Sequence, residues 1–293
     1  MRTLVFGGTG MLGQAVTVLA RGRGFPCLAL SHAQADVTDR ERLLYWAREF
    51  RPELVVNAAA FTQVDAAESE RDRAFAVNGA AVEAVTAAAA AAMPGGAVLL
   101  HVSTDYVFDG EGSTFYKEDA PTAPLSVYGA SKLEGERQAL QYGRALVVRT
   151  SWLFGPGGPN FVATIRRLLA AGKPLKVVDD QHGAPTYTPY LAKALLDLAA
   201  FAKDGLQGVI HYRNREPVTW YGFAREIARL GAATSDTVEV LPVTTAEFPR
   251  PAPRPAWSVL DVSRFEAVAG RRVEPWERGL AEYLTWLAEG ESR

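Results

Sequence analysis

The sequence predicts an α/β protein with a doubly wound parallel sheet and a smaller C-terminal lobe. Three observations predict it. Short apolar runs alternate with helical stretches over residues 1–150, the first run leads into a glycine-rich loop, and proline- and glycine-rich loops become frequent after residue 150. We therefore expect one domain over residues 1–150, and a segment over residues 151–293 that completes the sheet and forms the lobe.

Five apolar runs have the character of buried parallel strands, which are apolar on both faces because helices cover both sides of the sheet. They lie at residues 4–6, 27–30, 54–57, 98–103 and 145–149. The helical stretches between them are residues 11–21, 39–50, 67–93 and 127–142. Thr38, followed three residues later by Glu41, predicts a capping box at the start of the second helix. This alternation favours right-handed crossovers in one sheet.

The second half is more irregular. Residues 155–159 read Gly-Pro-Gly-Gly-Pro and predict a loop before a helix at residues 161–171. Further proline-rich loops follow at residues 184–189 and 248–255, and a final helix is expected at residues 276–287. We find no internal repeat and no free linker.

The bulk composition is that of an ordinary globular protein, with 293 residues, 48% of them hydrophobic and 22% charged. A net charge of −2 provides no positive field toward nucleic acid or an anionic membrane. Cys27 is the single cysteine and lies in an apolar run, which favours a buried, inert thiol. The chain opens directly on a strand pattern and has no apolar run of membrane-spanning length. We expect a cytoplasmic monomer or homodimer that binds neither nucleic acid nor membranes.

The loop after the first strand reads Gly7-Gly8-Thr9-Gly10-Met11-Leu12-Gly13. In a Rossmann-type domain, Gly7 would permit the tight turn, Gly10 would let the backbone approach a pyrophosphate, and Gly13 would let the helix pack close to the strand. The helix N-terminus supplies free N–H groups for the phosphates. This position between strand and helix predicts dinucleotide binding by Gly7, Gly10, Met11, Leu12 and Gly13.

The ends of the second and third strands predict the nucleoside contacts. Ser31-His32 stands where a carboxylate would bind the ribose of NAD, so we expect NADPH to be favoured and NADH to be accepted as well. Asp36 and Val37 fit a position beside the adenine, although Asp36 also suits a turn before the helix. Small side chains at Ala58, Ala59 and Ala60 would let the backbone lie against the cofactor, although close helix packing would also select alanine.

Tyr128 and Lys132 lie four residues apart and therefore share one face of the predicted helix. A tyrosine with an ordinary pKa near 10 is a poor proton donor and acceptor at neutral pH, and a nearby ammonium and a cationic nicotinamide both favour its phenolate. Thr104 ends the fourth strand and can bond a substrate carbonyl opposite Tyr128. Lys132 can also bond the ribose hydroxyls of the cofactor, so we expect Tyr128 and Lys132 to be cofactor contacts as well. Together with the glycine loop, these three residues predict a catalytic group.

These motifs resemble the extended short-chain dehydrogenase/reductases, and within them the dTDP-4-dehydrorhamnose reductase family. The glycine loop and the Tyr/Lys pair mark the superfamily, whereas later blocks are more specific and cover the chain nearly end to end. The matching blocks are residues 103–110 (STDYVFDG), 128–136 (YGASKLEGE), 149–155 (RTSWLFG), 160–161 (NF), 180–186 (DQHGAPT), 219–221 (TWY) and 254–260 (RPAWSVL).

The resemblance implies NAD(P)H-dependent reduction of the C4 keto group of dTDP-4-dehydro-L-rhamnose to dTDP-L-rhamnose. Tyr128 would give the proton to the new alkoxide, Lys132 would support it and Thr104 would hold the carbonyl. The implied substrate contacts are Thr104, Asp105, Tyr128, Trp152, Asn160 and Arg254. The residues leave alternatives open: Asp105 also suits a loop cap, Trp152 a core position, and Arg254 a surface position between two prolines.

Two departures and several rival functions qualify the resemblance. Phe154 stands where the family usually has tyrosine, and we recognise no acidic cluster of the kind that binds magnesium at a dimer interface in some members. We therefore predict neither a metal site nor that dimer.

The rival functions are a reductase, a dehydratase or an epimerase of another sugar nucleotide, and a non-catalytic protein like the regulatory subunit of methionine adenosyltransferase. A dehydratase usually has two consecutive acids after the strand, whereas here Asp105 is followed by Tyr106.

Overall fold

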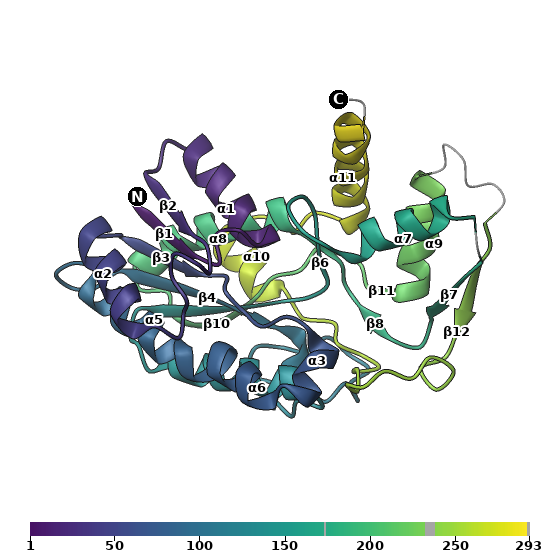
Figure 1. Ribbon diagram of the computed structural model, residues 1–293, viewed down its shortest axis with the longest axis horizontal. Helices are drawn as coiled ribbons and strands as arrows, with labels where there is room; N and C mark the ends of the chain where they lie inside the picture. The colour runs from purple at the N-terminus through teal and green to yellow at the C-terminus, as the bar shows by residue number, and fades with distance from the viewer. Residues whose placement is uncertain (173, 232–237, 292–293) are drawn as a thin grey trace.

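A six-stranded parallel sheet forms the centre of the larger part of the computed structural model, which describes residues 1–172, 174–231 and 238–291 (Figure 1). The strand order is β10-β5-β4-β3-β1-β2. The strands are β1 (Thr3–Phe6), β2 (Cys27–Leu30), β3 (Leu54–Asn57), β4 (Val98–Thr104), β5 (Ala145–Thr150) and β10 (Gly208–His211). The predicted doubly wound, Rossmann-type fold is confirmed.

The sheet extends from β1 to β2 on one side and from β1 through β3 to β10 on the other, so the glycine loop after β1 lies where the strand order reverses. β1 pairs with β2 on one side and with β3 on the other. Phe6 is in register with both Leu30 and Asn57, so these three strands end together. The segments that follow them therefore leave the sheet at one edge, which is where ligands bind in folds of this class.

Helices cover both faces of the sheet (Figure 1). One face carries α1 (Met11–Gly22), α8 (Thr188–Lys203) and α10 (Ser263–Ala269), and the other carries α2 (Arg40–Phe50), α5 (Ala81–Ala91) and α6 (Val127–Leu140). Each face has its own apolar core, and the strands contribute alternate side chains to the two cores. Burial on both faces explains why the strands are apolar throughout.

The start of α2 differs from the predicted capping box. The helix begins after Asp39, whose carboxylate accepts a hydrogen bond of 3.0 Å from Arg42 N. Thr38 instead donates its backbone N–H and its hydroxyl to Asp36 Oδ1, at 2.9 and 2.8 Å. Because Thr38 is held in this turn, the cap falls to the next residue able to provide an oxygen.

The helix predicted over residues 67–93 is a composite. α3 (Val64–Ser69) ends at Glu70, and α4 (Arg71–Phe75) continues through a π-helical turn, η1 (Ala76–Ala80), into α5. The run 71–91 is long and apolar enough to cross a membrane by length and composition. Its alanines and valines pack in the core beneath the sheet, which accounts for that composition.

The smaller lobe has its own aromatic and aliphatic core, which includes Phe154, Tyr187, Phe223, Trp276 and Tyr283. Its strands pair as β6–β9, β7–β12 and β8–β11. Its elements are β6 (Leu153–Phe154), α7 (Phe161–Ala170), β7 (Leu175–Val178), β8 (His182–Gly183), β9 (Thr186–Tyr187), β11 (Val218–Thr219), α9 (Trp220–Leu230), β12 (Val240–Val243) and α11 (Trp276–Glu291).

The chain does not finish the sheet before it builds the lobe. After β5 it enters the lobe, returns through α8 and β10 to the sheet, and re-enters the lobe at β11. Residues beyond 150 thus contribute to both parts, and the boundary at residue 150 stays a prediction.

Candidate active site

The glycine loop after β1 is packed too closely for side chains at Gly7, Gly8 and Gly13. Gly7 has a φ of +76°, and a Cβ added to it would lie 2.6 Å from Ala59 N. A Cβ at Gly13 would lie 2.2 Å from Gly7 O. Gly10 is the N-cap residue of α1 and has no side chain to occupy the first N–H groups of the helix. The loop therefore presents backbone donors and a helix N-terminus, which suit a diphosphate.

The alanines after β3 line the same edge. Ala58, Ala59 and Ala60 are all half-buried. Ala58 N donates to Phe6 O, and Ala59 N donates to Asn57 Oδ1 at 3.2 Å. The close approach of Gly7 to the backbone of Ala58 and Ala59 explains why small residues are needed there.

The residues after β2 form a local turn. Ser31 N and Oγ both bond Gln34 Oε1 at 3.0 Å, and Asp36 is occupied by Thr38 as described above. Asp36 Oδ2 also lies 3.7 Å from His32 Nε2, while Val37 is buried. Asp36 thus has the turn role that the sequence left open, and its contact with adenine stays a prediction.

The fold brings Thr104, Tyr128 and Lys132 together at the carboxyl end of β4. Thr104 ends β4, and α6 places Tyr128 and Lys132 against it. Ser126 caps α6 by accepting a hydrogen bond of 3.1 Å from Gly129 N. A Cβ at Gly129 would lie 2.1 Å from Tyr106 O, so glycine lets the first turn of α6 approach the end of β4.

Burial controls the protonation of these groups. Burial raises the pKa of Tyr128 to about 12, and hydrogen bonding from the Thr104 hydroxyl acts in the opposite direction. Burial also lowers the pKa of Lys132 to about 8, while the charge of Glu136 opposes this. Lys132 Nζ donates to Val102 O at 2.6 Å. The sequence predicted that Lys132 would lower the pKa of Tyr128; in the structure burial raises that pKa, and the hydrogen bond with Thr104 only partly opposes the rise.

Asp105 is buried beside this group. Thr104 Oγ1 donates to Asp105 Oδ1 at 3.0 Å, and the Ser258 hydroxyl also faces the carboxyl. Asp105 Oδ2 is buried without a hydrogen bond of ordinary geometry among the described residues. Burial raises the pKa of the Asp105 carboxyl to about 7.

Trp152 is held in a stacked pair rather than in a core. Its ring lies parallel to that of Trp220, with centroids 3.5 Å apart and planes at 7°. A Cβ at Gly183 would lie 2.4 Å from the indole of Trp152. Trp152 is half-buried and has a φ of 45°, a conformation that is uncommon for a residue with a side chain.

Asn160 connects the lobe to the glycine loop. Its carbonyl oxygen caps α7 by accepting from Ala163 N at 3.1 Å. Its amide nitrogen bonds Gly155 O at 3.0 Å and Tyr283 Oη at 2.9 Å, and lies 3.7 Å from Met11 Sδ. These contacts give Asn160 a role in holding the loop over α1, and a direct substrate contact stays a prediction.

Arg254 is paired with Asp65 of α3. Its Nη1 bonds Asp65 Oδ1 and also donates to Ala252 O at 2.6 Å. Arg250 forms a second ion pair with Asp65 at 2.7 Å. The hydrogen bond from Arg254 lowers the pKa of Asp65 to about 2. Arg254 is therefore neither a free surface residue nor a free phosphate ligand.

Sequence reasoning missed two residues that position this site. Asn78, in the π-helical turn, bonds Phe61 N and Phe61 O at 2.8 and 3.0 Å and Ser131 Oγ at 3.0 Å. It thereby joins α6 to the segment after β3. An Asn-Gly pair inside an alanine-rich helix is the signal that could have found it, because both residues are poor helix formers.

The second missed residue is Glu136, one turn beyond Lys132. It accepts a hydrogen bond of 2.5 Å from Ser103 Oγ and pairs with Arg149 through two bonds of 2.9 and 2.7 Å. Both partners of this ion pair are buried. The network fixes α6 to the ends of β4 and β5.

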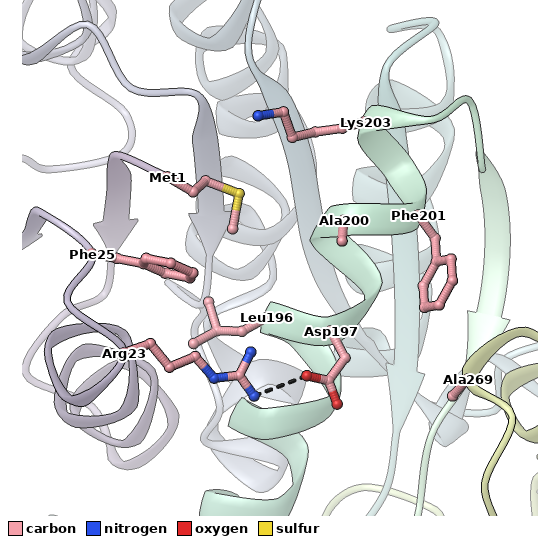
Figure 2. Close-up of a pocket in the computed structure, with 9 residues that line it drawn as sticks. All are labelled: Met1, Arg23, Phe25, Leu196, Asp197, Ala200, Phe201, Lys203 and Ala269. Atoms are coloured by element: carbon pink, nitrogen blue, oxygen red, sulfur yellow. Dashed lines mark hydrogen bonds and ion pairs between the residues drawn. The ribbon is translucent and has the colours of Figure 1, made fainter.

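A hollow of about 490 Å³ lies at the opposite edge of the sheet, before β1 and β2 (Figure 2). It is bridged by an ion pair of 2.8 Å between Arg23 and Asp197. Ligands of such sheets bind at the carboxyl ends of the strands, so we place the site at the glycine loop and Tyr128 rather than in this hollow.

Within residues 1–172, 174–231 and 238–291, no group of three or more His, Cys, Asp or Glu is arranged to hold a metal ion.

Comparison with known proteins gives matches over nearly the whole chain. The family model described as RmlD substrate binding domain matches residues 1–289. A dTDP-4-dehydrorhamnose reductase from Streptomyces griseus is 45% identical over 285 residues, which cover 96% of this chain and 92% of that protein.

Two solved structures are similar in fold and sequence. A dTDP-4-dehydrorhamnose reductase from Clostridium acetobutylicum has a TM-score of 0.91 and 36% identity, covering 98% of this chain and 100% of that chain. The enzyme of the same name from Bacillus anthracis, in complex with NADP, has a TM-score of 0.89 and 33% identity, covering 97% of this chain and 98% of that chain.

Proposed function

The chain belongs to the family described as RmlD substrate binding domain, and we propose from this membership that it is an oxidoreductase that reduces dTDP-4-dehydro-L-rhamnose to dTDP-L-rhamnose with NADPH. One observation on this chain's own residues supports the proposal. Thr104, Tyr128 and Lys132 meet at the carboxyl end of β4, on the same edge of the sheet as the glycine loop.

The glycine loop fits a dinucleotide cofactor. A Cβ at Gly7 or Gly13 would fill the space that the loop needs to turn, and Gly10 leaves the first N–H groups of α1 free of a side-chain cap. Met11 and Leu12 would contribute their backbone N–H groups to the diphosphate, and Ser31, Asp36, Val37 and residues 58–60 would contact the nucleoside. When bound, NADPH supplies the hydride that reduces the carbonyl.

The chain's own residues would supply the proton that the carbonyl oxygen takes up. The Thr104 hydroxyl would hold the carbonyl oxygen, and Tyr128 would give its phenol proton to the oxygen as negative charge develops there. Lys132, while charged, stabilises the phenolate that remains, and with a pKa of about 8 it loses that charge above this pH. Proton transfer of this kind contributes about 10²–10⁴-fold in rate.

The substrate contacts come from the lobe and from the end of β4. We propose that Trp152 contacts the substrate, because Trp220 holds its ring in one orientation. Asp105 would face the sugar beside Thr104. Arg254 would approach the diphosphate only by sharing its guanidinium between Asp65 and the substrate. The proposal also includes a cytoplasmic monomer or homodimer.

The test is the loss of NADPH and NADH absorbance with enzymatically generated dTDP-4-dehydro-L-rhamnose. We expect turnover with NADPH, and a fall of about 10²–10⁴-fold in kcat for Tyr128→Phe, which should still bind NADPH. Tyr45→Phe is the matched control, because Tyr45 is 52% exposed on α2, away from the site. Full activity in Tyr128→Phe would overturn the assigned role. NADPH binding without turnover would favour another keto-sugar nucleotide, or a regulatory protein.

A further inference from the structure

The Thr104 hydroxyl has a single hydrogen, and two oxygens compete for it. Thr104 Oγ1 lies 3.0 Å from Asp105 Oδ1 and also faces the Tyr128 phenol, whose pKa it lowers. Its lone pairs already accept a hydrogen bond of 3.2 Å from Tyr106 N. The direction of this one hydrogen therefore determines whether Thr104 donates to Asp105 or into the reaction site.

The surroundings of Asp105 stabilise its ionised carboxylate only weakly, so the side chain can be protonated or ionised near neutral pH. Its side chain is buried, and Oδ2 lacks a hydrogen bond of ordinary geometry among the described residues, which disfavours a full negative charge there. The titratable groups that interact with its charge are Tyr106 of its own turn and Tyr128 of α6. The nearby cations are Arg254, which lies beside Tyr106, and Lys132, one turn beyond Tyr128 on α6. Lys132 Nζ is bonded to Val102 O, and Arg254 is bonded to Asp65. Among the residues that the structure describes, neither cation forms an ion pair with the Asp105 carboxyl.

We propose that Asp105 is a positioning residue that sets the direction of the Thr104 hydroxyl through its own protonation. This inference rests on the proposed function, in which Thr104 holds the substrate carbonyl. An ionised Asp105 accepts the Thr104 hydrogen and withdraws it from the substrate. A protonated Asp105 donates to Thr104 Oγ1, and the Thr104 hydrogen then turns toward Tyr128 and the carbonyl. No covalent bond changes between heavy atoms, and the proton exchanges with solvent before substrate binds.

The coupling can be measured without substrate. In infrared difference spectra of the whole protein, the C=O stretch of a protonated carboxyl that is lost in Asp105→Asn reports the Asp105 titration. We expect it to titrate near neutral pH in the wild type. In Thr104→Val the titration should move upward, because the ionised carboxylate loses its hydroxyl donor. An Asp105 that is already ionised at pH 5, or a titration unmoved by Thr104→Val, would overturn the proposal.

The second measurement is the pH dependence of kcat/KM. For the wild type we expect a decrease of about tenfold between pH 6 and pH 8, since the free enzyme's essential groups set this profile. Asp105→Asn carries a permanent amide donor, so its profile should be flat between pH 6 and pH 7.5 even if its KM changes. Asp72→Asn is the control for loss of one carboxylate, because Asp72 is exposed on α4, and it should keep the wild-type profile.

The two measurements separate the two claims. Absence of turnover at every pH would defeat the proposed function, while the infrared titration would still decide the Asp105–Thr104 coupling. Turnover with a flat wild-type profile would leave the reductase function intact and overturn the role of Asp105. If Asp105→Asn does not fold, the Asp105 band is assigned as the carboxyl C=O stretch whose titration moves upward in Thr104→Val, and the absence of any such band would overturn the coupling.

Discussion

Asp105→Asn should change the pH dependence of stability by an amount that the structure sets. The unfolded chain releases the Asp105 proton near its ordinary pKa of 3.8, whereas the folded protein holds it to about 7. Between these values the folded state binds the extra proton, so the free energy of unfolding falls as pH rises from the lower pKa to the higher one. The loss is about 1.4 kcal/mol per pH unit up to the folded pKa of about 7 and levels off above it. Between pH 5 and pH 8 it therefore amounts to about 3 kcal/mol.

The assay is urea denaturation of the wild type and Asp105→Asn at pH 5, 6, 7 and 8, at constant ionic strength. Other titrating groups, such as the buried His101 and His211, cancel when the two proteins are compared at the same pH. We expect the free energy of unfolding of the variant, minus that of the wild type, to increase by about 3 kcal/mol from pH 5 to pH 8. A constant difference over this range would refute the reasoning, because it would show that Asp105 does not retain its proton in the folded protein.

Three further variants test the packing around the site. Glu136→Gln leaves Arg149 as a buried charge without its partner, so the free energy of unfolding should fall by about 3–5 kcal/mol in urea denaturation, and a loss below about 1 kcal/mol would contradict the burial of the pair. Gly13→Ala places a methyl carbon 2.2 Å from Gly7 O, so the Kd for NADPH in a fluorescence titration should rise at least about tenfold, and an unchanged Kd would contradict the loop geometry. Asp39→Ala removes the cap of α2 and should lower stability by about 1 kcal/mol in thermal unfolding, whereas Asp39→Asn should leave it nearly unchanged.

Much of the fold could be predicted because its signals are local. Strands buried on both faces must be apolar throughout, and the glycine loop stands directly between β1 and α1. Helix boundaries were harder. The predicted helix is interrupted at Glu70 and again by the π-helical turn at residues 76–80. Asn78 in that turn bonds to Phe61 and Ser131, and helix propensity contains no information about those partners.

In the candidate site, too, contacts between residues close in sequence could be predicted, whereas contacts between distant residues could not. Tyr128 and Lys132 are neighbours on one helix, so their spacing alone places them together. The pairing of Arg254 with Asp65 joins residues 189 positions apart, and the bond from Asn160 to Tyr283 joins residues 123 positions apart. Such contacts depend on how the lobe is seated against the sheet, which no local pattern specifies. The same applies to burial of Asp105, where Ser258 approaches from the far end of the chain.

The route of the chain through the two parts has a consequence for folding during synthesis. When residues 1–150 have left the ribosome, β5 has a free edge whose N–H and C=O groups pair only when β10 arrives at residues 208–211. The apolar side of α1 likewise waits for α8, against which it packs in the finished protein. Since free strand edges and apolar faces promote association between partly folded chains, we expect the nascent protein to be prone to association until α8 and β10 dock.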